Sequence, residues 1–347
     1  MAADRSAACL EFARRHLSGE PLTIEVASAD ASFRSYWRAR AGSASWIVMD
    51  APPALEDVHP WLDIGDRLRK AGLHAPQVLA TEVERGFVLM EDLGTRTYLT
   101  ELNNANADCL YGDALEALLR MQREVGTAGL PVFDATRTIP EMDLFGPWFL
   151  ERHLGLVPSC TQWDIIENAF RLIAAVADEQ PRCFMHRDYH SRNLLIAESG
   201  PRLGAAPLTN PGIIDFQGAM LGPVAYDLAS LLRDCYIAWP IERVDAWVEA
   251  HRQRLVAAGI VAVDGAHFRR WFDIIGLQRH IKVLGIFCRL CYRDGKAGYL
   301  ADLPRVLDYV LGVARHYLGL IDFADLLERT VDGRDISRAR SADSAPT

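Results

Sequence analysis

The chain of 347 residues is long enough for two domains or for one large two-lobed domain. Hydrophobic residues make up 50% of it and charged residues 24%, a composition that excludes the disordered and fibrous classes of protein. The formal net charge of -9 argues against nucleic acid as the main partner.

The apolar pattern and the cysteines indicate the compartment. No apolar run approaches the roughly 20 residues of a membrane helix, so we expect no membrane partner. Residues 1–17 have the spacing of an amphipathic helix and lack the apolar segment of a signal peptide. Seven cysteines, an odd number, predict reduced thiols and a cytoplasmic location. The pair Cys288 and Cys291 lies in an apolar helical run, which favours buried structural cysteines over a metal or redox site.

The first part of the chain alternates between strand and helix patterns. Runs rich in β-branched and aromatic residues predict strands at residues 22–27, 32–40, 45–51 and 86–94, with a hairpin turn at 41–45. Helical spacing of the apolar residues predicts a helix over 58–73 that ends near Gly72. We therefore expect residues 1–93 to form a small sheet with one inserted helix.

Helices dominate from about residue 94 to residue 330, where apolar residues recur every three to four positions. The helical segments include residues 113–125, 148–155, 163–180, 225–236, 244–259, 268–290 and 303–320. Two short strand-like runs interrupt them, at 193–197 and 211–216, and the Gly- and Pro-rich residues 199–212 predict a surface excursion. Residues 331–347 lack an apolar face and predict a disordered tail.

The stretch FMHRDYHSRNLL, residues 184–195, concentrates polar groups between apolar runs. His186 and His190 are four residues apart, a spacing that suits zinc when both lie on one helix, but no glutamate stands between them. Phosphoryl transfer instead requires an aspartate that aligns the attacking hydroxyl, and oxygen ligands for magnesium. Asp188, Asn193 and Asp215 supply these groups, and the spacing Asp-x-x-x-x-Asn is typical of kinase catalytic loops. A zinc pair and a non-catalytic polar loop are the alternatives.

HRDYHSRNLL followed by IIDFQGAMLGPVAYDLASLL resembles the aminoglycoside phosphotransferase and choline kinase superfamily. The resemblance implies an α+β, protein-kinase-like fold with a small β-rich N-lobe (1–93) and a large, mainly helical C-lobe (94–330). It also implies ATP and Mg²⁺ as cofactors, Asp188 as catalytic base, and Asn193 and Asp215 as magnesium ligands. Asp227 then braces the catalytic loop, and is also placed to cap the following helix, while His186 supports the loop geometry.

The motifs DASFRSYWR, VMDAPP, LMEDLG, WFLERHLG and QRHIKVLGIFCRLCYRDGK are similar to those of bacterial kinases of cell-wall amino sugars. That similarity spans roughly residues 25–320 and implies phosphorylation of the anomeric hydroxyl of N-acetylmuramate or N-acetylglucosamine, so the expected partner is a small sugar acceptor. Aminoglycoside or choline-type kinase activity is the alternative within the superfamily. A non-catalytic, pseudokinase-like binding module is an alternative of another class.

One departure concerns the phosphates of ATP. Kinase-like folds place a lysine on the third strand, where this chain has Met49, and none of its three lysines can be aligned there. We expect Arg34 to supply the positive charge and the small residues around Ser32 to admit backbone N–H groups to a phosphate. In LMEDLG, the resemblance implies that backbone groups of Glu91 and Leu93 contact adenine.

The acceptor site is predicted from charge. Residues 241–300 hold ten basic and six acidic residues, a balance of +4, which suits a neutral or anionic acceptor better than a polycationic aminoglycoside. Most of these basic residues are expected on solvated helix faces. The leading acceptor contacts are Glu151 and Arg152, followed by Arg289, and His190 faces the acceptor in the family pattern.

Overall fold

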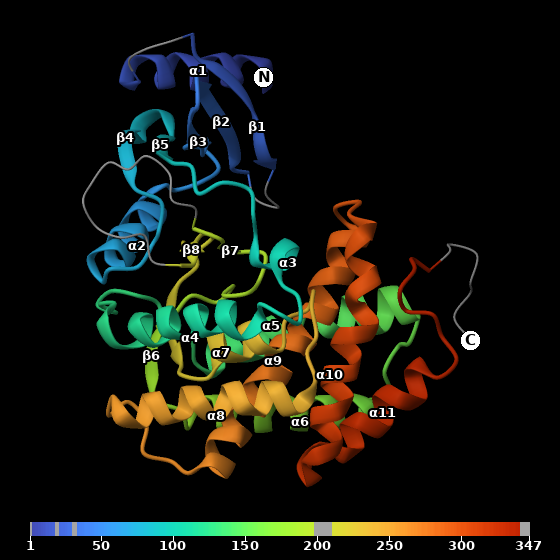
Figure 1. Cartoon of the computed structure of the whole chain (residues 1–347). Helices are drawn as coiled ribbons and strands as arrows, with labels where there is room; N and C mark the ends of the chain where they lie inside the picture. The colour runs from blue at the N-terminus through green and yellow to red at the C-terminus, as the bar shows by residue number, and fades with distance from the viewer. Residues whose placement is uncertain (1, 18–20, 30–32, 198–209, 341–347) are drawn as a thin grey trace. The chain divides into compact units, whose positions relative to one another are not determined.

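The computed structural model describes residues 2–17, 21–29, 33–197 and 210–340, which form two compact units. The first unit comprises residues 1–126 and 192–219, and the second comprises residues 127–191 and 220–347. The first is built around a five-stranded antiparallel sheet, and the second is mainly helical (Figure 1). This agrees with the expected α+β class. The predicted division into an N-lobe (1–93) and a C-lobe (94–330) of different functions stays a prediction. The two units are defined by how the chain packs and not by contacts with ligands.

The sheet of the first unit has the strand order β1-β2-β3-β5-β4. Its strands are β1 (Thr23–Ala29), β2 (Ser35–Ala41), β3 (Ala44–Asp50), β4 (Val78–Glu82) and β5 (Phe87–Glu91). Four of them lie where the sequence predicts strands, and β4 was not predicted. Between the short 3-10 turn η1 (Val83–Arg85) and β5, Gly86 has a φ of +76°, and a Cβ there would lie 1.7 Å from the Ala51 carbonyl oxygen. Only glycine fits that turn.

Helix α1 (Ala2–His16) covers one face of this sheet (Figure 1). Phe12 is fully buried and its ring lies 5.6 Å from that of Phe87, within a cluster that also contains Val48 and Leu89. Burial of each such side chain contributes about 1.5–3 kcal/mol. Arg5 of the same helix forms an ion pair with the buried Asp50 at the end of β3. The amphipathic helix predicted at the N-terminus is therefore confirmed as α1, whose apolar residues complete the core of the sheet.

The remaining elements of the first unit are helical, apart from one short strand pair. They are α2 (His59–Lys70), α3 (Tyr98–Glu101), α4 (Ala107–Glu124), β7 (Leu194–Leu195) and β8 (Gly212–Ile213). The predicted helix over 58–73 is confirmed as α2, which has a proline in its first turn and is followed by Gly72 with a φ of +74°. The predicted surface excursion at 199–212 lies almost entirely outside the described residues.

The second unit consists mainly of helices and contains one two-stranded sheet, β6 (Arg182–Met185) with β9 (Met220–Pro223). Its helices are α5 (Ala135–Met142), the π-helix η2 (Phe145–Leu154), α6 (Cys160–Asp178), α7 (Tyr226–Leu232), α8 (Ile241–Ala257), α9 (Gly265–Tyr292), η3 (Ala297–Asp302), α10 (Leu303–His316), η4 (Leu318–Leu320) and α11 (Ile321–Val331). Strands β6 and β9 were not predicted. None of the helices within the described ranges is long and apolar enough to cross a membrane.

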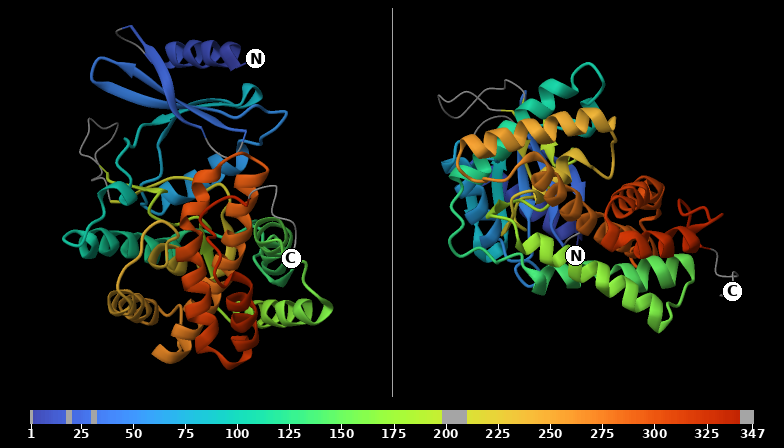
Figure 2. Two further views of the ribbon diagram at one scale, coloured as in Figure 1. Left: turned by 90° about the vertical axis from the view of Figure 1, so that its right-hand side faces the viewer. Right: turned by 90° about the horizontal axis from the view of Figure 1, so that it is seen from below.

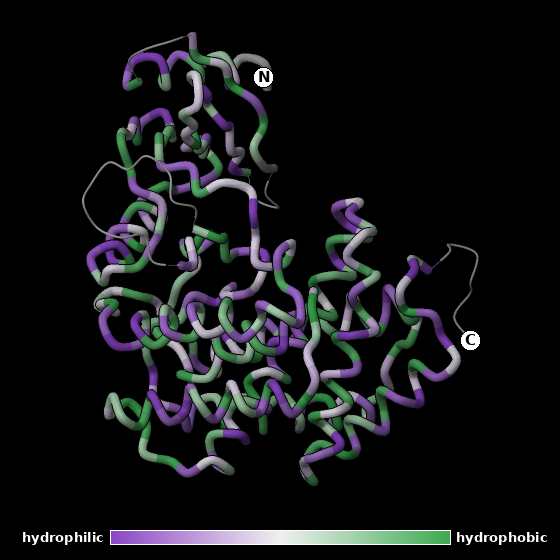
Figure 3. The backbone as a smooth tube through the Cα atoms, viewed as in Figure 1, coloured by the Kyte–Doolittle hydropathy of each residue, from purple (hydrophilic) through white to green (hydrophobic). Residues whose placement is uncertain are grey.

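Helices α8 and α9 differ in how they are buried. Hydrophilic and hydrophobic residues alternate along α8 (Figure 3), and its buried residues recur every three to four positions, as in a surface helix. Helix α9 is 28 residues long and packs against α10, α6 and η2 (Figure 2). Its buried residues lie around much of its circumference. The expectation that basic residues of this region lie on solvated faces is therefore wrong for Arg279, which is 5% exposed.

The end of the chain packs on the second unit as far as residue 340. Ile336 is buried, its carbonyl oxygen lies 3.0 Å from Nε2 of His153, and the Arg340 amide donates to the Tyr292 hydroxyl at 2.8 Å. The predicted disordered tail is therefore wrong for residues 331–340, the first of which ends α11. Residues 341–347 lie outside the described residues.

Candidate active site

Two candidate oxygen ligands lie next to each other in the first unit. Asn193 immediately precedes β7 and Asp215 follows β8, and the two strands pair antiparallel. The Asn193 carbonyl accepts from the Ile214 amide at 3.1 Å, and Asn193 Nδ2 donates to Asp215 Oδ2 at 3.3 Å. An amide oxygen and a carboxylate are donors that Mg²⁺ prefers, so this pair fits the metal implied by the family resemblance.

The backbone and the neighbouring residue fix Asp215. Its φ of +63° is in the left-handed region, which non-glycine residues rarely adopt and which recurs at functional sites. Phe216 is fully buried, and its ring lies 5.2 Å from that of Trp61 on α2. Gly65 allows this approach, because a Cβ there would lie 3.1 Å from the Phe216 ring. Asp215 Oδ1 also accepts from Gln217 Nε2 at 2.7 Å.

The strand pair that carries these ligands is bonded to the segment expected to meet adenine. The Ile213 amide donates to the His74 carbonyl at 2.8 Å, and His74 Nε2 lies 3.1 Å from Glu91 Oε1. The Glu91 amide donates to the Gln77 carbonyl at 2.8 Å, so the amide of this residue is used within the sheet. Leu93 lies against Gly212. Glu91, Leu93, Asn193 and Asp215 thus belong to one bonded framework, and their roles stay predictions.

Met49, which stands where kinase-like folds have a lysine, lies in the same unit. Met49 is fully buried in β3, opposite Val88 of β5, which leaves no room for a solvated cation at that position. Arg34 is partly exposed and immediately precedes β2, whose first residue pairs with Asp50 at the end of β3. Ser32 lies outside the described residues. Arg34 therefore stays the predicted source of positive charge.

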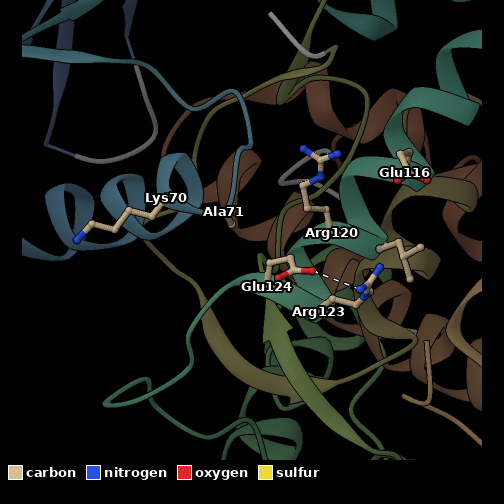
Figure 4. A pocket seen from close by; sticks show the side chains of 7 residues that line it. Lys70, Ala71, Glu116, Arg120, Arg123 and Glu124 are labelled. Carbon is tan, nitrogen blue, oxygen red and sulfur yellow. Dashed lines mark ion pairs between the residues drawn. The ribbon is translucent and has the colours of Figure 1, made fainter. Parts of the chain in front are cut away.

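Lys70 is the lysine closest in sequence to the strands of the first unit, and its side chain is exposed to solvent. Its side chain is 76% exposed and its Nζ lies 2.7 Å from Asp66. It lines a hollow of about 360 Å³ with Arg120, Arg123 and Glu124 at the C-terminal ends of α2 and α4 (Figure 4). None of the candidate nucleotide or metal residues lines this hollow, so we assign it no part in the chemistry.

Residues 186–191 of the candidate catalytic loop lie in the second unit and are held at both ends. Asp227, 2% exposed, accepts from the amides of His186 at 2.6 Å and Arg187 at 3.0 Å, the contacts expected of a residue that braces this loop. The buried Asp234 accepts from the Ser191 amide at 2.9 Å. Arg187 has a φ of +78°. The interpretation of Asp227 as a helix cap is wrong, because α7 is capped at Ala225 and Asp227 lies within the helix.

Opposing effects act on the carboxylates of this loop. Burial raises the pKa of Asp188, but the nearby charges of Lys282, His190, Arg279 and Arg187 outweigh burial and bring it below its ordinary value. Burial raises the pKa of Asp227 to about 7 despite its two backbone donors. Asp188 is therefore the more acidic of the two and is a carboxylate at neutral pH, as a group that accepts a hydroxyl proton must be.

His186 and His190 are not arranged as the zinc alternative requires. They lie on a loop and not on one helix, and no group of three or more His, Cys, Asp or Glu side chains that could hold a metal occurs in the described ranges. Nδ1 of His186 accepts from the Asp188 amide at 3.3 Å, so this ring supports the loop. The His190 ring lies edge-on to that of Tyr236, with 5.5 Å between centroids. The Cys288 and Cys291 thiols are buried and free, as expected of structural cysteines.

Three of the four acceptor candidates lie on η2 and α9 of the second unit. Glu151 and Arg152 are exposed on η2, where the Arg152 guanidinium lies 5.1 Å from the centre of the Tyr292 ring. Tyr292 is ten residues from Lys282 on α9, about 15 Å at the helical rise of about 1.5 Å per residue. Arg289, partly buried, lies two turns from Lys282 on the same side of that helix. Their role in binding an acceptor stays a prediction.

Sequence reasoning missed the groups that surround Asp188 in the fold. Lys282 is the only charged residue between His280 and Arg289, in a buried helix, and such an isolated charge is a signal that could have identified it. Glu141 had no comparable signal. It lies 47 residues before Asp188 in a short helix that was not predicted.

Comparisons with known proteins bear on the family and on the fold. A model of the phosphotransferase enzyme family matches residues 23–265. The N-acetylmuramate/N-acetylglucosamine kinase of Pseudomonas putida is 41% identical over 306 residues, covering 88% of this chain and 87% of that protein. The kinase of the same name from Pseudomonas aeruginosa is 41% identical over 320 residues, covering 91% and 90%.

A solved structure, that of the aminoglycoside phosphotransferase APH(2'')-Ib with ADP bound, is similar to this one with a TM-score of 0.57. It is 14% identical in sequence and covers 87% of this chain and 97% of that chain, so it supports the fold alone. The resemblance seen in the catalytic motifs and the protein-kinase-like fold class are thereby confirmed. The chain belongs to the phosphotransferase enzyme family.

Proposed function

We propose that the chain is an ATP-dependent sugar kinase of the cytoplasm that phosphorylates the anomeric C1 hydroxyl of N-acetylmuramate, N-acetylglucosamine or both. The observation that carries this proposal is the 41% identity, over about nine-tenths of both chains, to kinases named for these two sugars. The candidate site supports it, since the three residues expected of the chemistry are all present. All seven cysteines are free, which suits a reducing compartment.

Asp188 is the proposed catalytic base. The C1 hydroxyl donates its hydrogen bond to the Asp188 carboxylate, so that the hydroxyl oxygen attacks the γ-phosphorus in line. A bond forms between O1 and the γ-phosphorus while the bond from that phosphorus to the β–γ bridging oxygen breaks. The hydroxyl proton passes to Asp188, and the products are a sugar 1-phosphate and ADP. The clamp of Asp227 and Asp234 on the loop holds the base in place for this step.

Asn193 and Asp215 are the proposed ligands of Mg²⁺. When bound, the ion neutralises charge on the phosphates. Because Asp215 is fixed by its neighbour Phe216 and by the bonded strand pair, the ligands are preorganised before nucleotide binds. Arg34, backbone N–H groups near Ser32, and backbone groups of Glu91 and Leu93 are proposed to bind the phosphates and adenine.

Glu151, Arg152, His190 and Arg289 are proposed as acceptor contacts. An arginine suits the carboxylate that N-acetylmuramate carries on its lactyl group. N-acetylglucosamine lacks that carboxylate, so an Arg152→Met or Arg289→Met variant should raise the KM for N-acetylmuramate more than that for N-acetylglucosamine. The preference of the unchanged enzyme between the two sugars is given by the ratio of its kcat/KM values for them.

Two other functions give different results in the same assay. Purified protein is mixed with Mg-ATP and N-acetylmuramate, N-acetylglucosamine, kanamycin or choline, and ADP release is followed. We expect turnover with the amino sugars and a product phosphorus NMR signal coupled to the anomeric proton. The 1-O-methyl glycoside of N-acetylglucosamine is the matched control and should not react, because its anomeric oxygen carries no proton.

Turnover with kanamycin or choline alone would contradict the sugar assignment, and absence of ATP binding by calorimetry would favour a pseudokinase-like module. In the active enzyme, Asp188→Asn should abolish turnover and leave the affinity for nucleotide largely intact. Asp215→Asn should instead weaken nucleotide binding in the presence of magnesium.

A further inference from the structure

Two ion pairs connect the catalytic loop to helix α9 through Glu141. The Arg187 guanidinium pairs with Glu141 of α5, and Glu141 Oε2 lies 3.0 Å from Nζ of Lys282 on α9. The side chains of Lys282 and Glu141 are only 12% and 18% exposed. Gln278, one turn before Lys282, adds a contact from its Nε2 to Glu141 Oε2 at 3.4 Å. Glu141 therefore fixes the Lys282 ammonium on the side of α9 that faces the loop.

Arg187, Glu141 and Lys282 together carry a net positive charge. Lys282 and Arg187 carry two positive charges, and Glu141 offers one negative charge between them. A buried cation in excess is unfavourable unless another anion lies close by. Asp188, next to Arg187 in sequence, supplies that anion. The charged groups that act on Asp188 are Arg187 and His190 of the loop, Asp227 of α7, and Arg279 and Lys282 of α9. Glu141 of α5 and Tyr226 of α7 act in turn on Lys282.

We propose that Lys282 is a positioning residue for the catalytic reaction, whose ammonium, held by Glu141, keeps Asp188 a carboxylate and orients it toward the acceptor hydroxyl. This inference rests on the proposed role of Asp188 as base and adds to it a residue 94 positions away in the chain. Consistent with that geometry, Lys282 is the positive charge that lowers the pKa of Asp188 most, against the effect of burial.

The first test compares pH profiles. We expect Lys282→Met to move the acid limb of kcat to higher pH by about one unit or more, which lowers kcat about tenfold at pH values on that limb. The KM for ATP should change less than twofold. Lys282→Arg should restore the limb, and Lys296→Met, which removes an exposed lysine of the same region, is the matched control. A folded Lys282→Met enzyme whose kcat is unchanged, or lowered equally at every pH, would overturn the proposal.

A second test does not need turnover and covers the case in which Lys282→Met fails to fold. The chain has three lysines, so lysine labelled with ¹⁵N gives three ammonium signals. We expect Asp188→Asn to shift the Lys282 signal and lower its pKa while the signals of Lys70 and Lys296 stay in place. An unmoved Lys282 signal would refute the inference. Because this readout involves no acceptor, it separates failure of the inference from failure of the sugar-kinase proposal, which the acceptor panel tests.

Discussion

Helix α9 and the π-helix η2 approach so closely at Gly285 that one added methyl group should destabilise the second unit. A Cβ at position 285 would lie 2.5 Å from the Leu144 carbonyl carbon, 2.6 Å from its oxygen and 2.8 Å from the Phe145 amide nitrogen. Carbon atoms in contact are normally about 3.5–4.0 Å apart, so the two backbones would have to separate by about 1 Å. Backbone atoms cannot rotate aside as the end of a side chain can.

The expected magnitude for Gly285→Ala follows from two opposing effects. Overpacking in a core costs about 1–3 kcal/mol, and contact with backbone places this site near 3 kcal/mol. Alanine is favoured over glycine within a helix by about 1 kcal/mol, which offsets part of that cost. We therefore expect the free energy of unfolding to fall by about 2 kcal/mol.

The assay is urea unfolding followed by tryptophan fluorescence and far-UV circular dichroism. Gly312→Ala is the matched control, because Gly312 is exposed within α10 and a Cβ there meets nothing within 4 Å. That control should gain about 0.5–1 kcal/mol from helix propensity alone. If Gly285→Ala stabilised the protein as much as the control does, the close approach of α9 to η2 would be refuted.

Three further predictions concern stability, each measured by urea unfolding. Arg38→Met should lower the free energy of unfolding by about 3 kcal/mol at pH 7, because it leaves the carboxylate of Asp92, 5% exposed, without its guanidinium. The loss should be smaller at pH 5, where that carboxyl can protonate, and an equal loss at both pH values would contradict this. Ser159→Ala removes the capping box of α6 and should cost about 1 kcal/mol, whereas no change would mean that water replaces the cap. Burial lowers the pKa of His280 to about 3, so below about pH 6.5 this residue binds a proton in the unfolded chain and not in the folded protein. On this account the free energy of unfolding should fall by about 2 kcal/mol from pH 7 to pH 5. In His280→Phe the fall over the same pH range should be smaller by about 2 kcal/mol.

The catalytic motifs could be predicted from sequence because the residues that carry them are close together in the chain. Asp188 and Asn193 are five residues apart, and Asp215 ends a short apolar run of its own. The helices with clear three-to-four-residue spacing were predicted for a similar reason, since a periodic pattern is a local property. Strands β4, β6 and β9 have only four or five residues each and gave too few positions for alternation to be recognised.

Groups that act on the loop from a distance could not be predicted in the same way. Glu141 and Lys282 come from helices on either side of the motif in sequence, and only packing brings their side chains within 3.0 Å of each other. The contacts of residues 332–340 depend likewise on His153 and Tyr292, far earlier in the chain. We have no physical account of why residues 145–154 adopt a π-helix in place of the α-helix that their apolar spacing suggests.

The left-handed backbone at Asp215 sets stability against the proposed chemistry in a selection experiment. A left-handed conformation costs a residue with a Cβ roughly 1–2 kcal/mol and costs glycine little. A library screened for heat resistance alone is therefore expected to enrich glycine at position 215, which removes the carboxylate proposed to hold the metal. Arg187 is also left-handed, but glycine there would break its ion pair with Glu141, and that loss offsets the relief of strain. Position 215 is therefore the one to hold fixed when this protein is evolved for stability.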